Sequence, residues 1–166
     1  MKKHLHSVVL ATACGLALGT SASAATLVFE HGDPNEFRDI RATDQSQVRF
    51  EERVLKDLEE HFRKEAAALP EGQTLRVNVT DVDLAGFVEY FHQRYPMGLR
   101  VIRNVDIPQM ELSYELRDAN DAVIQSGDEM LKDLGFRLTT IQPRRDDPLR
   151  YEKWMVSEWF ERTFGS

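Results

Sequence analysis

Two aspartates separated by one residue, Asp81 and Asp83, have the type and spacing that acid–base or metal chemistry requires. Because side chains alternate across an extended chain, both carboxylates face the same side. They share the parity of the apolar residues in the alternating run from Leu75 to Thr80, which predicts a place at the rim of the core. Such a pair could bind a hard cation or act as acid and base. We favour a structural interpretation, in which both carboxylates accept backbone N–H groups and hold the turn before Gly86.

Aromatic side chains follow these aspartates, at four of the nine positions from 87 to 95. Rings that lie beside polar groups suit a ligand pocket or a partner surface. The steps of four between Phe87, Phe91 and Tyr95 instead predict a short helix that ends at Pro96 and packs Phe87 and Phe91 onto the core, and we favour that reading. The candidate binding residues are Asp81, Asp83, Phe87, Tyr90, Phe91, Arg94 and Tyr95.

Other catalytic patterns in the sequence are weak. Asp57, His61 and Glu65 recur at steps of four, as metal ligands on a helix do, but an H-E-x-x-H pattern is absent and we interpret this face as solvated. No serine lies in a G-x-S-x-G elbow, and no glycine-rich phosphate loop is present. We therefore expect no metal and no cofactor. The alternative to a binding protein is a hydrolase-like or metal-dependent enzyme that uses Asp81 and Asp83.

Charge and length exclude further classes of protein. The chain has 166 residues, of which 42% are apolar, and a net charge of −7. A general nucleic-acid binder needs a basic surface, so nucleic acid is not an expected partner. Arg94, Arg100 and Arg103 could still form a local basic patch that suits an anionic partner.

The N-terminus has the pattern of a cleaved secretory leader. Two lysines precede a short apolar stretch from Val8 to Leu18, and the small residues from Ala22 to Ala24 place the cut after residue 24. Lipidation at Cys14 is the alternative, which we set aside because it would cut through the apolar stretch. Cleavage leaves 142 residues with a net charge of −9 and no cysteine, and no transmembrane segment is expected in them.

Hydrophobic periodicity predicts one α+β domain over residues 25–166. The order of elements is β-α-β-β-β-β-α, with a mixed sheet of four to five strands and two main helices packed on it. The helices are expected at 47–69 and 149–164, and the strands at 25–30, 75–80, 99–105, 110–116 and 122–128. The first two strands, joined by a long helix, are expected to be parallel.

Three segments carry a family resemblance: TDVDLAG at 80–86, MELSYELRDANDAVIQSG from Met110, and DPLRYEKWMVSEWF at 147–160. Their order and spacing resemble those of bacterial exported proteins catalogued as domain of unknown function 3016, over the span from Val28 to Phe160. One departure is Asp121, where glycine is expected in the hairpin turn, and Asn120 is expected to take the left-handed conformation there. The resemblance implies export and a common fold but no activity.

Together these observations predict a periplasmic protein with a binding or envelope accessory role and without catalysis. Its partner is expected to be another periplasmic protein or a small ligand.

Overall fold

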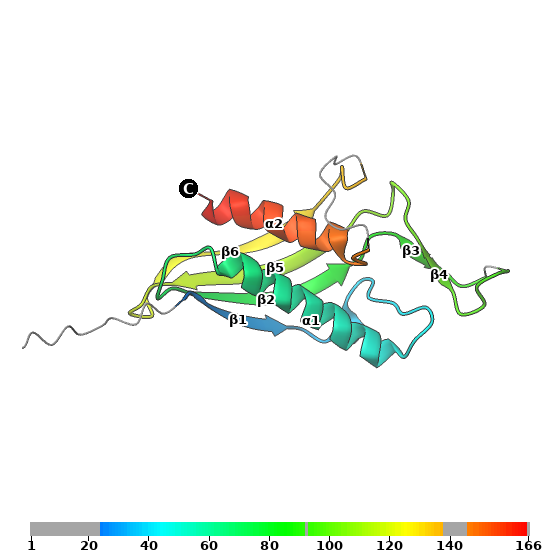
Figure 1. Cartoon of the computed structure of the whole chain (residues 1–166), viewed down its shortest axis with the longest axis horizontal. Helices are drawn as coiled ribbons and strands as arrows, with labels where there is room; N and C mark the ends of the chain where they lie inside the picture. The colour runs from blue at the N-terminus through cyan, green and yellow to red at the C-terminus, as the bar shows by residue number, and fades with distance from the viewer. Residues whose placement is uncertain (1–23, 92, 138–145, 166) are drawn as a thin grey trace, which may run out of the picture.

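The computed structural model describes residues 24–91, 93–137 and 146–165 (Figure 1). The leader predicted at 1–24, apart from its last residue, lies outside the described residues, and so does Cys14. Along the chain the elements are β1 (Thr26–His31), a 3-10 turn (Pro34–Glu36), α1 (Gln47–Ala66), β2 (Thr74–Asp83), β3 (Phe87–Glu89), β4 (Leu99–Val101), β5 (Gln109–Arg117), β6 (Val123–Lys132) and α2 (Arg150–Phe164). The predicted order of elements is confirmed with one strand more, β3, and the α+β fold class is confirmed.

Four strands form one mixed sheet in the order β1-β2-β5-β6. β1 and β2 are parallel, as predicted, because the long helix α1 carries the chain back between them. The pairs β2/β5 and β5/β6 are antiparallel. The sheet thus runs from a parallel edge at β1 to a hairpin edge at β6.

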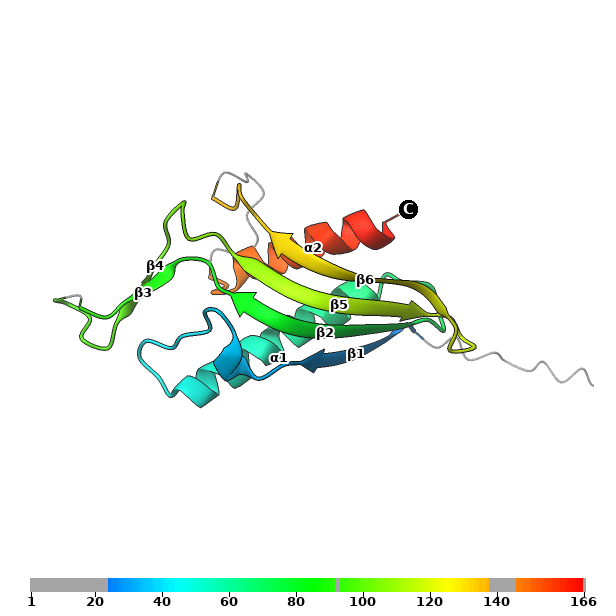
Figure 2. The ribbon, with the colours of Figure 1, turned by 180° about the vertical axis from the view of Figure 1, so that it is seen from behind.

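Both helices lie on the same face of this sheet (Figures 1 and 2). Their apolar stripes meet the buried residues of the strands, so the core is a single layer between helices and sheet. Trp159 of α2 is fully buried at the centre of this layer, and its ring contacts those of Phe62 on α1 and Tyr114 on β5. Of the helices that the structure describes, none has the length and apolar character needed to cross a membrane.

A shift of register in β2 changes the face on which the two aspartates lie. The pairing with β5 shifts between Val79 and Asp81, and beyond the shift Val82 is the buried residue, 0% exposed. Asp81 pairs with Glu111, on the sheet face that carries no helix. The expectation that Asp81 and Asp83 keep the parity of the apolar residues was therefore wrong, because an extra residue in a strand reverses every later side chain.

The predicted helix over 87–95 was also wrong. Phe87–Glu89 and Leu99–Val101 pair as the antiparallel strands β3 and β4, in a sheet of their own. Gly86 and Gly98 both have positive φ angles, which turn the chain before and within this hairpin. Aromatic and β-branched residues suit such a ribbon at least as well as a helix. We call residues 87–101 the aromatic arm, because this hairpin projects beyond the end of the main sheet (Figure 2).

The turn between β5 and β6 differs in one detail from the expectation. Asp121, not Asn120, adopts the left-handed conformation, with φ of 63°. The Asp118 carboxylate stabilises the turn by accepting the N–H groups of Asn120 (2.8 Å) and Ala122 (3.0 Å). The hairpin itself is present as predicted, and β6 extends to Lys132.

We predict that Gly86→Ala will destabilise the protein by about 2–5 kcal/mol. Gly86 has φ of 83°, and a Cβ atom there would overlap the carbonyl oxygen of Val101 and lie 2.8 Å from Ile102 Cδ1. A left-handed non-glycine residue costs about 1–2 kcal/mol and overpacking about 1–3 kcal/mol. The matched control is Gly32→Ala, whose Cβ would meet Phe37 at an ordinary 3.4 Å. Urea unfolding of both variants measures the difference, and equal effects would contradict the prediction.

Candidate functional site

The Asp81 carboxylate is engaged within the protein. One oxygen accepts the backbone N–H of Arg38 at 2.7 Å, and the other forms an ion pair with the Arg38 guanidinium at 2.8 Å. The same guanidinium contacts Glu111 at 3.1 Å on the neighbouring strand. Asp81 therefore ties the segment after the 3-10 turn to the end of β2.

Asp83 lies beside the same segment. Its backbone forms a parallel bridge with Asp39, and its carboxylate accepts a hydrogen bond of 3.4 Å from the Gln109 amide. Burial raises the pKa of the Asp83 carboxyl, and the charges of Asp39 and Asp81 raise it further, while Arg38 opposes them. In the part of the chain that the structure describes, no group of three His, Cys, Asp or Glu side chains could hold a metal ion. The aspartates thus join three segments of backbone at the base of the aromatic arm.

Arg100 of β4 anchors the arm to the body of the protein. Its guanidinium pairs with both carboxylate oxygens of Asp39, at 3.1 and 3.2 Å. It also donates to the carbonyl oxygens of residues 84, 85 and 86, at 3.3–3.4 Å, in the turn that leads into β3. A guanidinium suits this position because its planar array of donors can satisfy a carboxylate and several carbonyls together.

A buried carboxyl holds the other side of that turn. Glu152, in the first turn of α2, is 1% exposed, and its Oε1 accepts the N–H of Ala85 at 2.7 Å. Its Oε2 has no hydrogen-bond partner in the described structure. Burial raises the pKa of the Glu152 carboxyl, although the Ala85 hydrogen bond and the charges of Arg100 and Arg150 oppose the rise. The fold therefore favours the protonated form of this side chain.

The tip of the arm is apolar and in solvent. Phe91 is 98% exposed, and Tyr90, Tyr95 and Met97 are exposed with it. Phe87 is different, because it lies at the base, half-buried, with the Arg103 guanidinium 3.8 Å from its ring centre. The predicted packing of Phe91 onto the core is thus wrong: the aromatic spacing reflects a ribbon that no core covers.

The candidate residues do not converge on one site. Asp81, Asp83 and Phe87 belong to the base of the arm, and the exposed rings belong to its tip. The predicted basic patch is partly neutralised, since Arg100 pairs with Asp39 and Arg103 pairs with Asp106 at 2.6 Å. Arg94 also has an interaction within the protein. What remains at the tip is an apolar surface.

The helix face of Asp57, His61 and Glu65 was interpreted as solvated, and this is wrong for His61 and Glu65, whose side chains are 12% and 22% exposed and lie against α2. Sequence reasoning missed the cluster of contacts that this face forms with the second helix. His61 Nε2 lies 2.8 Å from the Lys153 carbonyl and 2.9 Å from Ser157 Oγ, whose hydroxyl donates to Glu65 at 2.9 Å. A carbonyl can only accept, so Nε2 carries the hydrogen and cannot take a proton from Ser157. Burial lowers the pKa of His61, which keeps the ring neutral. The cluster clamps α1 to α2 and is not a catalytic pair.

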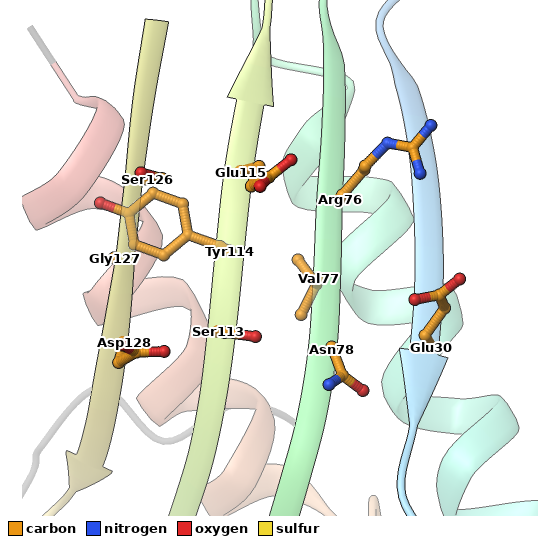
Figure 3. Close-up of a pocket in the computed structure, with 10 residues that line it drawn as sticks. All are labelled: Glu30, Arg76, Val77, Asn78, Ser113, Tyr114, Glu115, Ser126, Gly127 and Asp128. Carbon is orange, nitrogen blue, oxygen red and sulfur yellow. The ribbon is translucent and has the colours of Figure 1, made fainter. Parts of the chain in front are cut away.

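The helix-free face of the sheet has a shallow polar hollow of about 460 Å³ (Figure 3). The sequence feature that corresponds to this hollow is a polar residue at every second position in β2, β5 and β6. An antiparallel sheet with one covered face normally presents such residues to water, so the hollow alone does not indicate a ligand. It is lined by the side chains of Glu30, Arg76, Asn78, Ser113, Glu115, Ser126 and Asp128.

We predict that Glu152→Gln will change how stability depends on pH. The folded pKa of Glu152 lies above its ordinary value of 4.5, so the stability that its protonated form provides is complete below that value. This stability is lost as pH rises through the folded pKa. The amide of glutamine keeps an oxygen for the Ala85 N–H but does not ionise. The melting temperature of the variant, relative to that of the parent, should therefore increase as pH rises from 4 to 8.

Two results bear on this prediction. Parallel curves for parent and Glu152→Gln would contradict it. The control Glu152→Leu removes the acceptor and leaves the buried Ala85 N–H unpaired, so it should cost about 1–3 kcal/mol at every pH.

Comparison with known proteins identifies the family. A single family model matches residues 25–162, a span that includes every strand and nearly all of both helices. Its description is protein of unknown function (DUF3016). No curated protein and no solved structure matches the chain. The resemblance found in the three sequence segments is thus confirmed, and the chain belongs to the DUF3016 family.

Proposed function

We propose that this protein is an exported, non-catalytic binding protein that engages a second protein of the cell envelope through its aromatic arm. The observation that carries the proposal is Phe91, 98% exposed at the tip of a projecting hairpin (Figure 2). Burying such a ring is worth about 1.5–3 kcal/mol, so leaving it in water together with two tyrosines and a methionine is costly. A partner that covers the tip recovers this free energy.

The shape of the arm favours a protein as the partner. Small-molecule sites are concave and enclose most of their ligand. The arm is instead a narrow ribbon that projects from the body, and its tip can enter a pocket on another surface, as aromatic hot-spot residues do. Residues 90–98, between β3 and β4, contain no aspartate or glutamate, so acidic groups around that pocket would meet no like charge at the tip of the arm. The partner is thus a protein with an apolar pocket.

The contacts of the two aspartates support a non-catalytic role. A carboxylate pair that works on a substrate must be open to it in a cleft. Asp81 is held by the backbone and side chain of Arg38, and Asp83 is held by Gln109. Their carboxylates organise the base of the arm, so they contribute to binding by positioning it.

We expect a photoreactive benzoylphenylalanine at position 91 to cross-link the protein to one discrete partner in intact cells. The ring at 91 lies at the centre of the proposed contact, so irradiation captures what covers it. The same group at position 48 is the control, since Val48 is an exposed apolar residue of α1. Adding Tyr90→Ser and Met97→Ser should abolish the adduct at 91 without changing the melting temperature. Identical adducts from positions 91 and 48, or none from 91, would contradict the proposal.

The export half of the proposal rests on the leader pattern and has its own test. We predict that the protein purified from cells begins at Ala25, which mass spectrometry will report. We also predict that cell fractionation will release it with the periplasmic fraction. Ala24→Arg should block cleavage because the site requires a small residue. Cys14→Ser should leave processing unchanged, whereas a lipoprotein would lose it. Uncleaved protein in the cytoplasm would refute export.

A further inference from the structure

The outer edge of β6 is open in the described part of the chain. β6 is the last strand of the sheet, ten residues long, and only β5 pairs with it. Such an edge presents a row of N–H and C=O groups to any strand that can pair with it. Proteins usually protect a long edge with proline or a covering segment, and β6 contains no proline.

Apolar side chains are exposed at both ends of this strand. Val123 and Ile124 are 48% and 51% exposed at its start, and Met130 is 54% exposed near its end. The residues between them are polar or glycine, with the sequence QSGDE at 125–129. An antiparallel copy of the same strand would place the start of one copy beside the end of the other. The pattern is therefore self-complementary.

We propose that two copies of this chain pair antiparallel through β6, with the two-fold axis at Gly127, and form a continuous eight-stranded sheet. In this register Ser126 lies opposite Asp128 and Gln125 lies opposite Glu129, so no two carboxylates face each other directly. The apolar start of each strand lies opposite the apolar end of the other. The register with β5 shifts at the start of β6, where Ile124 is the extra residue, and both Ile124 and the paired Val123 are apolar.

Other registers are poorer for a physical reason. Residues directly opposite each other in two paired strands lie on the same face of the sheet. The two-fold axis of the dimer must therefore pass through a residue and not between two residues. An axis at Asp128 or at Glu129 would place a carboxylate opposite itself, which is destabilising. An axis at Ser126 would place Asp128 opposite Ile124, a charge against an apolar side chain. Among residues 126–129, Gly127 is therefore the one position for the axis that satisfies both ends of the strand.

The groove next to β6 supports the same partner. α2 contacts β6, and between them lies a groove of about 370 Å³ whose lining includes Met130, Trp154, Glu158 and Arg162. In the two-fold pair both α2 helices lie on the same side of the continuous sheet. With the axis at Gly127, Met130 lies opposite Ile124, so the groove of each copy lies beside the apolar start of the partner's β6.

Sedimentation velocity of the full chain, expressed with its leader, over a range of concentrations tests the proposal. The parent should be a dimer, and Met130→Lys should raise the dimer dissociation constant about tenfold or more, because each dimer loses two apolar contacts. The control Val48→Lys changes an equally exposed residue on α1, which contacts β1 at the other side of the sheet, and should leave dimerisation unchanged. A parent that stays monomeric at all concentrations, or a dimer that Val48→Lys weakens as much, would overturn the proposal.

Thiol cross-linking tests the register. In a Cys14→Ser background, Ser126→Cys combined with Asp128→Cys places two thiol pairs opposite each other across the axis, and mild oxidation should give a covalent dimer. The control pair Val48→Cys with Lys56→Cys lies at exposed positions of α1, too far apart for a disulfide within one chain, and should give none. Equal yields from the two pairs, or no dimer from the edge pair, would reject the β6 pairing. Neither experiment involves the aromatic arm, so this proposal and the proposed function can fail separately.

Discussion

The packing around Trp159 is the constraint on which the rest of the structure depends. The fully buried indole of Trp159 contacts aromatic rings from α1, β5 and its own helix, α2. It therefore joins both helices to the sheet. Only one face of the sheet takes part, since both helices lie on that face (Figure 1). A two-layer domain of this kind has its main core between the helices and one sheet face, and it leaves the other sheet face and both sheet edges uncovered. The surfaces available for function therefore include the edge at β6 and the loops at the ends of the strands.

The arm depends on that core only through its base. A two-stranded ribbon is at best marginally stable alone, and β3 and β4 pair over just three residues each. Arg100 and Glu152 hold the turn before β3 from opposite sides, one by donating to its carbonyls and one by accepting its N–H. Burying a carboxyl without a full set of partners costs stability. Glu152 therefore fixes the turn before the arm at a cost to the free energy of the core.

Sequence periodicity predicted the elements that bury one face and failed for those that do not. The helix from residue 47 and the strands near 75 and 110 follow the period of a covered face, so their positions were predictable. Phe87, Phe91 and Tyr95 carry a helical spacing, but no core selects one face of the arm, and a spacing without a buried face has no structural meaning. The face of Asp81 depended on one extra residue in β2, which no alternation of residue types reveals. The contacts of Arg100 and Glu152 join distant segments and have no local signal.

The two proposed surfaces have a geometrical consequence when taken together. The arm lies at the end of the sheet where β2 finishes and β5 begins. In an antiparallel pairing through β6 the second copy is turned end for end, so the two arms point in opposite directions from an eight-stranded sheet. Such a dimer cannot place both tips in neighbouring pockets on one small partner. It can instead bridge two partner molecules, or two distant sites on an extended assembly, and each contact then raises the effective concentration of the other. A projecting arm with a modest apolar tip is sufficient for that purpose, because two weak contacts joined by a rigid sheet hold more tightly than either contact alone.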